Sequence, residues 1–91
     1  MEGLTEGRIV HYVLNEGLDK GEHRPAMVVR VWRITHDGNI KTPPENGCSN
    51  LQVFTDSDGK YNDELPPVMW KTSILFDESG APGTWHWIEK A

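Results

Sequence analysis

The chain is poor in cysteine and in long hydrophobic runs. Its single cysteine, Cys48, cannot form an internal disulfide, so the 91 residues are not held together as a disulfide scaffold. No apolar stretch approaches the roughly 20 residues that cross a bilayer as a helix. Met1 is followed by Glu2 and Gly3, without the basic segment and apolar run of a signal peptide. We therefore expect a cytoplasmic protein with no membrane partner.

Basic residues are also scarce. Nine Lys and Arg side chains stand against fourteen Asp and Glu, for a formal net charge of −5. Proteins that follow a phosphate backbone normally show the opposite balance, so general binding to DNA or RNA is not expected. A small anionic ligand is compatible with this charge, because a local basic group can act against the net sign. One such group is Lys20, His23, Arg24 and Arg30.

Helical patterns are missing as well. Six prolines interrupt the chain, and the stretches between them lack apolar residues at i, i+3 and i+4. The chain instead has five runs rich in β-branched and aromatic residues, separated by clusters of Gly, Pro, Asn and Asp. These runs cover residues 8–14, 26–34, 50–56, 68–76 and 83–90.

The pattern predicts a single all-β domain over residues 1–91, because a chain of this length builds one core. We expect a small five-stranded SH3-like barrel with long loops and little or no helix, since closure protects the strand edges. An OB-fold is the main alternative, but it usually carries a helix that residues 57–67 do not favour. Residues 15–25, 35–49 and 57–67 are expected to be long connections, and only 77–82 looks like a tight hairpin.

Alternation within the second run separates its side chains into two faces. Met27, Val29 and Val31 share one face, and Arg30 and Trp32 share the other. One face is expected to be core.

Four histidines and Cys48 raise the question of a metal site. No two of these histidines lie at i, i+2 or i, i+4, the separations with which one element commonly supplies two ligands. We therefore expect no metal site and no cofactor.

Two of the histidines are expected to interrupt apolar strand faces. His11 lies between Ile9 and Val13, and His86 lies between Thr84 and Ile88. A histidine in such a place is either a hydrogen-bonded core residue or part of a cavity. The first and last strands of many small barrels are neighbours, which would bring His11 and His86 together.

Four tryptophans are many for so short a chain. Trp85 and Trp87 flank His86 on the opposite strand face, while Trp32 and Trp70 lie in other runs. Their ordinary use is core packing, and their alternative use is stacking on a planar ligand or covering a subunit interface. Because the interior is too small for all four, we expect a homo-oligomer.

Arg24 is a candidate phosphate ligand. Pro25 biases it towards an extended conformation, and its guanidinium can donate two parallel hydrogen bonds. The alternative role is a surface ion pair with Glu22 or Asp19.

The opening of the chain resembles a known family. Gly7-Arg8-Ile9-Val10, a loop, and His23-Arg24-Pro25-Ala26-Met27-Val28-Val29 are similar to the start of the MazF/PemK-type toxins, metal-independent endoribonucleases on an SH3-like barrel. The resemblance implies that Arg24 acts at a scissile phosphate and that Thr55, in Leu51-Gln52-Val53-Phe54-Thr55, assists it. It covers about the first 30 residues, and the chain lacks that family's C-terminal helix.

Most of the chain also resembles a group of small uncharacterised proteins of tailed phages and prophages. The matching segments are His-Tyr-Val-Leu at 11–14, His-Arg-Pro-Ala at 23–26, Leu-Gln-Val-Phe-Thr-Asp at 51–56 and Thr-Trp-His-Trp at 84–87. This resemblance implies a phage-encoded protein but brings no activity with it. Small phage proteins of this size often interfere with host defence, and that association suggests an anti-defence role.

The leading hypothesis is a binding protein for a nucleotide-like ligand, which sequesters a host immune signal. Its predicted ligand-binding residues are His11, His23, Arg24, Thr55, Trp85, His86 and Trp87. A metal-independent phosphodiesterase or endoribonuclease is the alternative, with His11 and His86 as acid and base and Arg24 stabilising the transition state. A third hypothesis is an adaptor that binds another protein through its tryptophans.

Overall fold

The computed structural model describes residues 1–36, 40–56 and 65–89. These residues form an all-β structure without a helix, which confirms the predicted fold class. The strands are β1 (Ile9–Val13), β2 (His23–Val31), β3 (Ile34–His36), β4 (Ile40–Thr42), β5 (Ser49–Phe54), β6 (Val68–Ile74) and β7 (Trp85–His86).

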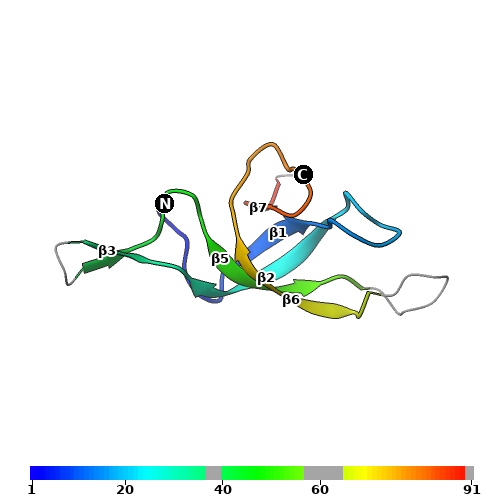
Figure 1. Ribbon diagram of the computed structural model, residues 1–91, viewed down its shortest axis with the longest axis horizontal. Helices are drawn as coiled ribbons and strands as arrows, with labels where there is room; N and C mark the ends of the chain where they lie inside the picture. The colour runs from blue at the N-terminus through cyan, green and yellow to red at the C-terminus, as the bar shows by residue number, and fades with distance from the viewer. Residues whose placement is uncertain (37–39, 57–64, 90–91) are drawn as a thin grey trace.

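Five strands form one antiparallel sheet in the order β6-β5-β2-β1-β7, and β3 and β4 form a separate two-stranded hairpin (Figure 1). The more detailed expectation of an SH3-like barrel stays a prediction. Within the described ranges, the chain contains no helix long and apolar enough to cross a membrane.

The strands depart from the predicted runs in three places. β3 begins at Ile34, the last residue of the second predicted run, and continues into segment 35–49, a predicted loop that also contains β4. Strands of three residues are too short to show a period in the sequence. β2 starts at His23 and not at residue 26. The last run shortens to Trp85–His86, and its end at Lys90 lies outside the described residues. Residues 57–64 of the third predicted loop also lie outside them.

The buried side chains of β2 do not follow the simple alternation that the sequence suggested. Ala26, Val28 and Val31 are buried, whereas Met27 and Val29 are exposed. A β-bulge between Val28 and Arg30 is the reason, because the extra residue changes the phase of the side-chain alternation. The expected set of Met27, Val29 and Val31 is therefore split.

Residues 77–82 do not form the tight hairpin that the sequence suggested. β6 and β7 lie at opposite edges of the sheet, and the chain between them crosses from one edge to the other. The Trp85 backbone N–H donates to Leu75 (3.0 Å) and the Asp77 N–H donates to Trp85 (2.9 Å), which gives a parallel bridge between Phe76 and Trp85. Asp77 makes a local turn by accepting two bonds from Ser79, but this turn does not pair antiparallel strands.

Two of the four tryptophans lie outside the core. Trp32 and Trp70 are exposed, Trp87 is partly buried and Trp85 is fully buried. On the outer side of the sheet, Trp70 is accompanied by other exposed apolar residues, among them Met27 and Phe54. The homo-oligomer stays a prediction.

Trp85 is the largest buried side chain and contacts a glycine that no other residue can replace. Its indole N–H donates to the Gly47 carbonyl over 2.8 Å, and its ring centroid lies 5.0 Å from that of Phe76. Gly47 has a φ of +68°, and a Cβ there would lie 2.6 Å from the Phe76 Cβ and 2.8 Å from the Trp85 ring. Both the backbone conformation and the available space require glycine.

We expect Gly47→Ala to lower the free energy of unfolding by about 2–5 kcal/mol, the sum of a left-handed backbone penalty and overpacking. Gly7→Ala is the matched control: Gly7 has a φ of +89°, and a methyl group added there would meet no atom within 4 Å. Gly7→Ala should lower the free energy of unfolding only by the left-handed backbone penalty, about 1–2 kcal/mol. Urea unfolding measures both, and equal losses would contradict the proposed clash.

An ion pair connects the segment before β1 to the segment that follows β2. The Glu6 carboxylate accepts bonds of 2.6 and 2.7 Å from the Arg33 guanidinium and one of 2.9 Å from the Val31 N–H. These bonds, those from Arg33 first, lower the pKa of Glu6 from 4.5 to about 2.

Because the pKa of Glu6 is lower in the folded state, its carboxylate stabilises the fold fully above pH 4.5, and this contribution is lost as the pH falls towards 2. Glu6→Gln should therefore lower Tm at neutral pH. The difference in Tm between this variant and the wild type should become smaller as the pH falls from 4.5 towards 2. Glu78→Gln, at an exposed carboxylate, is the control for the loss of a surface charge and should change Tm at neutral pH much less than Glu6→Gln does. A Glu6→Gln difference that stays constant with pH would count against the ion pair.

Candidate functional site

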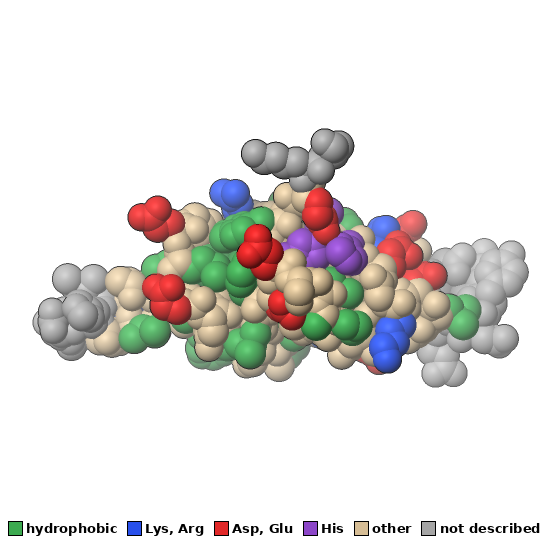
Figure 2. Space-filling view, turned by 90° about the horizontal axis from the view of Figure 1, so that it is seen from above, with side chains coloured by type: hydrophobic (Ala, Val, Ile, Leu, Met, Phe, Trp, Pro, Cys, Tyr) green, Lys and Arg blue, Asp and Glu red, His purple; other side chains and the backbone are tan. Residues whose placement is uncertain are grey.

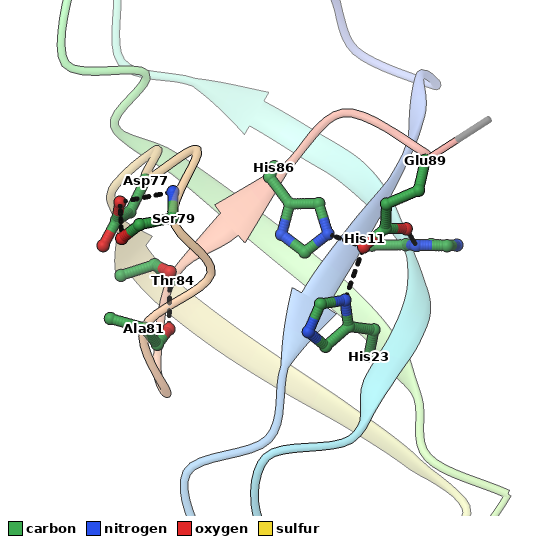
Figure 3. A network of polar contacts seen from close by, with 8 residues as sticks. All are labelled: His11, His23, Asp77, Ser79, Ala81, Thr84, His86 and Glu89. Atoms are coloured by element: carbon green, nitrogen blue, oxygen red, sulfur yellow. Dashed lines mark hydrogen bonds and ion pairs between the residues drawn. The ribbon is translucent and has the colours of Figure 1, made fainter.

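Three histidines and one glutamate converge on one face of the molecule. His11, His23, His86 and Glu89 each offer a potential ligand atom, and these atoms all lie within 4.8 Å of one another. Figure 3 shows the imidazoles around the Glu89 carboxylate, and Figure 2 shows histidine side chains gathered at the surface. We refer to these four residues as the histidine-glutamate cluster.

Strand register brings the three histidines together. His11 in β1 is paired with His86 in β7, and their ring centroids are 5.8 Å apart. His11 is also paired with Pro25 in β2, and His23 shares the face of Pro25 because side chains alternate along a strand. The rings of His23 and His86 are 4.7 Å apart. The predicted adjacency of the first and last strands is confirmed.

Glu89 contacts all three imidazoles. One carboxylate oxygen accepts from His23 Nδ1 at 2.5 Å and from His86 Nε2, and the other accepts from His11 Nδ1. Its own backbone N–H first, and then the bonds from His23, His86 and His11, hold the pKa of Glu89 well below its usual range. The cluster therefore contains an ionised carboxylate at neutral pH.

The cluster is buried at one side and open at the other. The His86 side chain is 6% exposed, while that of Glu89 is 46% exposed. His86 Nδ1 is buried and has no hydrogen-bond partner among the described residues. Such an unpaired buried atom is costly, and a bound water would satisfy it, whereas His86 Nε2 is the ring nitrogen that faces Glu89. The open side leaves the cluster accessible to a small ion.

A hollow of about 250 Å³ lies beside the cluster. Its lining contains two carboxylates and, within the described residues, no Lys or Arg, which makes it unfavourable for a phosphate group. The lining residues are Phe76, Glu78, His86, Trp87, Ile88 and Glu89.

Arg24 does not join the histidines. Its Nε donates to the Phe54 carbonyl over 3.1 Å, and its Nη1 lies 3.0 Å from the Glu22 carboxylate. Because successive residues of a strand point to opposite faces, Arg24 lies on the face opposite His23. Arg24 is therefore not brought together with His11 and His86 as predicted, and it forms the ion pair with Glu22 that was the alternative role.

Thr55 and Trp85 also lie away from the cluster. The Thr55 hydroxyl donates to the Pro66 carbonyl, and the residue is almost fully buried. Its neighbour Phe54 accepts from Arg24, so Arg24 and Thr55 lie near the same end of β5. Trp85 faces the core because it alternates with His86, and full burial leaves it no ring face for a ligand, which corrects its predicted stacking role.

Trp87 is the predicted stacking residue that does lie at the site. It lines the hollow beside His86 and packs against Trp85 with a centroid distance of 5.0 Å. The Arg8 guanidinium lies 5.2 Å from the Trp87 ring centroid. One cation therefore already lies over this ring.

Glu89 is the member of the cluster that sequence reasoning missed. The only sequence signal for Glu89 is that it follows His86 by three residues. Because β7 ends at His86, this spacing does not predict that the two side chains meet. The expectation of no metal site rests on spacing along the chain, and that argument does not apply to ligands that come from β1, β2 and the segment around β7. The four residues could hold a metal ion.

No protein-family model, curated protein or solved structure matches this chain. The resemblances to MazF/PemK-type toxins and to phage proteins stay predictions.

Proposed function

We propose that this protein binds a divalent transition-metal ion, Zn²⁺ in the first instance, at the histidine-glutamate cluster. The observation that carries the proposal is the convergence of three imidazoles and one carboxylate from positions up to 78 residues apart. Imidazole and carboxylate groups are ordinary zinc ligands, and four of them complete a tetrahedral site.

The spacing of the donor atoms is close to that of a zinc site. Zinc-nitrogen bonds of about 2.0 Å in a tetrahedron place the ligand atoms about 3.3 Å apart. The donor atoms here lie within 4.8 Å of one another, so binding requires shifts of about an ångström. The exposed side chains of His23 and Glu89 have room for these shifts, while buried His86 anchors the site.

Surface ion pairing explains the cluster less well. Exposed ion pairs contribute only about 0–1 kcal/mol, and one carboxylate does not require three partners. A metal ion shared by the three imidazoles and Glu89 would use all four groups. It would fasten the segment after β7 to β1 and β2, so that metal binding stabilises the fold.

The nucleotide-like ligand and the metal-independent nuclease gain no support at this cluster. Arg24 points to the other face of the sheet, and the adjacent hollow contains the carboxylates of Glu78 and Glu89. An anionic ligand in this hollow would therefore meet negative charge and would lie away from Arg24.

Calorimetric titration of the tag-free full chain with Zn²⁺ tests the proposal. We expect one ion per chain and an affinity that falls on acidification, because imidazoles must lose a proton to bind. His86→Ala and Glu89→Gln should each weaken binding at least as much as the roughly 10- to 100-fold loss seen for outer-shell partners. His36→Ala is the control, because β3 supplies none of the four residues of the cluster, and it should bind as the wild type does.

Thermal unfolding separates a site from adventitious binding. Zn²⁺ should raise Tm of the wild type and of His36→Ala, because a ligand of the native state stabilises it, but not Tm of His86→Ala. The proposal would be contradicted if the wild-type protein bound no Zn²⁺, or if His86→Ala bound Zn²⁺ as tightly as the wild type does.

A further inference from the structure

A basic cleft lies at the opposite end of β2 from His23. Its volume is about 430 Å³, within the range of small-molecule sites. In Figure 1 the chain passes here from the five-stranded sheet into the β3-β4 hairpin. The cleft contains three cationic side chains and one carboxylate, in a chain whose net charge is −5. Its lining residues are Glu6, Val29, Arg30, Val31, Trp32, Arg33 and Lys41.

Trp32 is exposed in this cleft and yet fixed in orientation. The residue is 42% exposed, and its indole N–H donates to Asn50 Oδ1 over 2.9 Å. Asn50 is buried, and the same oxygen accepts from the Thr72 hydroxyl at 3.0 Å and the Ser73 N–H at 2.9 Å. An aromatic ring that is held in place before a ligand arrives loses little freedom on binding.

Backbone irregularities in the two strands on either side of β5 lie next to Asn50. The β2-β5 register shifts between Val28 and Arg30, and Arg30 is paired with Asn50. The β5-β6 register shifts between Ser49, paired with Ile74, and Leu51, paired with Lys71, so the extra residue lies in β6. Ser73 in β6 has a φ of 56°, in the left-handed region that favours glycine. Bulges commonly re-aim side chains next to binding sites, and residues in strained conformations cluster there. Here they present Arg30 and Trp32 to the cleft.

Two cations of the cleft are available for an anion. Arg33 is bonded through both terminal nitrogens to Glu6, so these two charges offset each other. Arg30 and Lys41 have no ion-pair partner in the described part of the chain, and the Arg30 guanidinium lies 5.1 Å from the Trp32 ring centroid. A phosphate group placed here would meet net positive charge.

Trp32 also borders a second, largely apolar hollow of about 370 Å³ with Ile34, Pro44 and Cys48 in its lining. The indole thus lies between a basic and an apolar surface, a combination that suits a planar ring carrying an anion. We propose that the basic cleft binds a mononucleotide, with its base packed against Trp32 and its phosphate bonded to Arg30 and Lys41. The net charge of −5 disfavours a longer nucleic-acid strand. This site is independent of the metal.

An NMR titration of the ¹⁵N-labelled full chain with adenosine monophosphate tests this proposal. The indole resonance of Trp32, identified by its loss in Trp32→Phe, and the amides of Arg30 and Lys41 should shift. Arg30→Ala and Lys41→Ala should each weaken binding by roughly tenfold or more, because a hydrogen bond to a charged group is lost. Lys20→Ala removes an exposed lysine of the loop before β2 and is the matched control, with unchanged binding.

Separate titrations with adenosine, inorganic phosphate and a single-stranded oligodeoxyadenylate define the ligand. Adenosine and phosphate should each bind at least about tenfold more weakly than the mononucleotide, since each makes only part of the contacts. Phosphate that binds as tightly as the mononucleotide would overturn the role of the base. An oligonucleotide that binds while the mononucleotide does not would overturn the choice of ligand. The proposed site would be wrong if the mononucleotide shifted none of these resonances, or if it shifted them equally in Arg30→Ala and Lys41→Ala.

Discussion

Burial of the Trp85 indole holds the last strand in the sheet, and the arrangement of the histidines depends on it. β7 has only two residues, Trp85 and His86, so its own ladder with β1 is short. A buried aromatic side chain of this kind removes about 150–250 Å² from water, which corresponds to an upper value of about 4–6 kcal/mol. The hydrogen bond to Gly47 and the contact with Phe76 orient the ring. Because neighbours on a strand point to opposite faces, burying Trp85 directs His86 to the other face of the sheet.

The long strand β2 separates two regions of opposite electrostatic character. At its start, His23 faces His11, His86 and the ionised Glu89, a set of groups that suits a cation. At its end, Arg30 and the residues that follow it line a cleft that suits an anion. The chain carries a net charge of −5, so total charge describes neither region. Local geometry decides which ion each end can hold.

Much of the fold follows from local sequence patterns. Prolines and glycines mark the ends of the runs that form β1, β2, β5 and β6, and the absence of a helical stripe predicts an all-β chain. The adjacency of the first and last strands, which brings His11 beside His86, is predictable as well, because these strands are neighbours in many small β domains. Those inferences need only periodicity and general rules of strand adjacency.

The remaining features depend on register and on contacts between distant residues. The bulge in β2 changes which of its side chains face the core, and alternation alone cannot show it because the partner strand β5 determines where an extra residue fits. Arg24 is close in sequence to His23, but a one-residue offset in a strand places it on the other face. Glu89 joins the cluster only through a tertiary contact that spans 78 residues. The sequence by itself determined where the longer strands β1, β2, β5 and β6 form, because that depends on neighbouring residues. Only the tertiary structure decided which side chains meet, because cross-strand pairing joins positions that no local pattern connects.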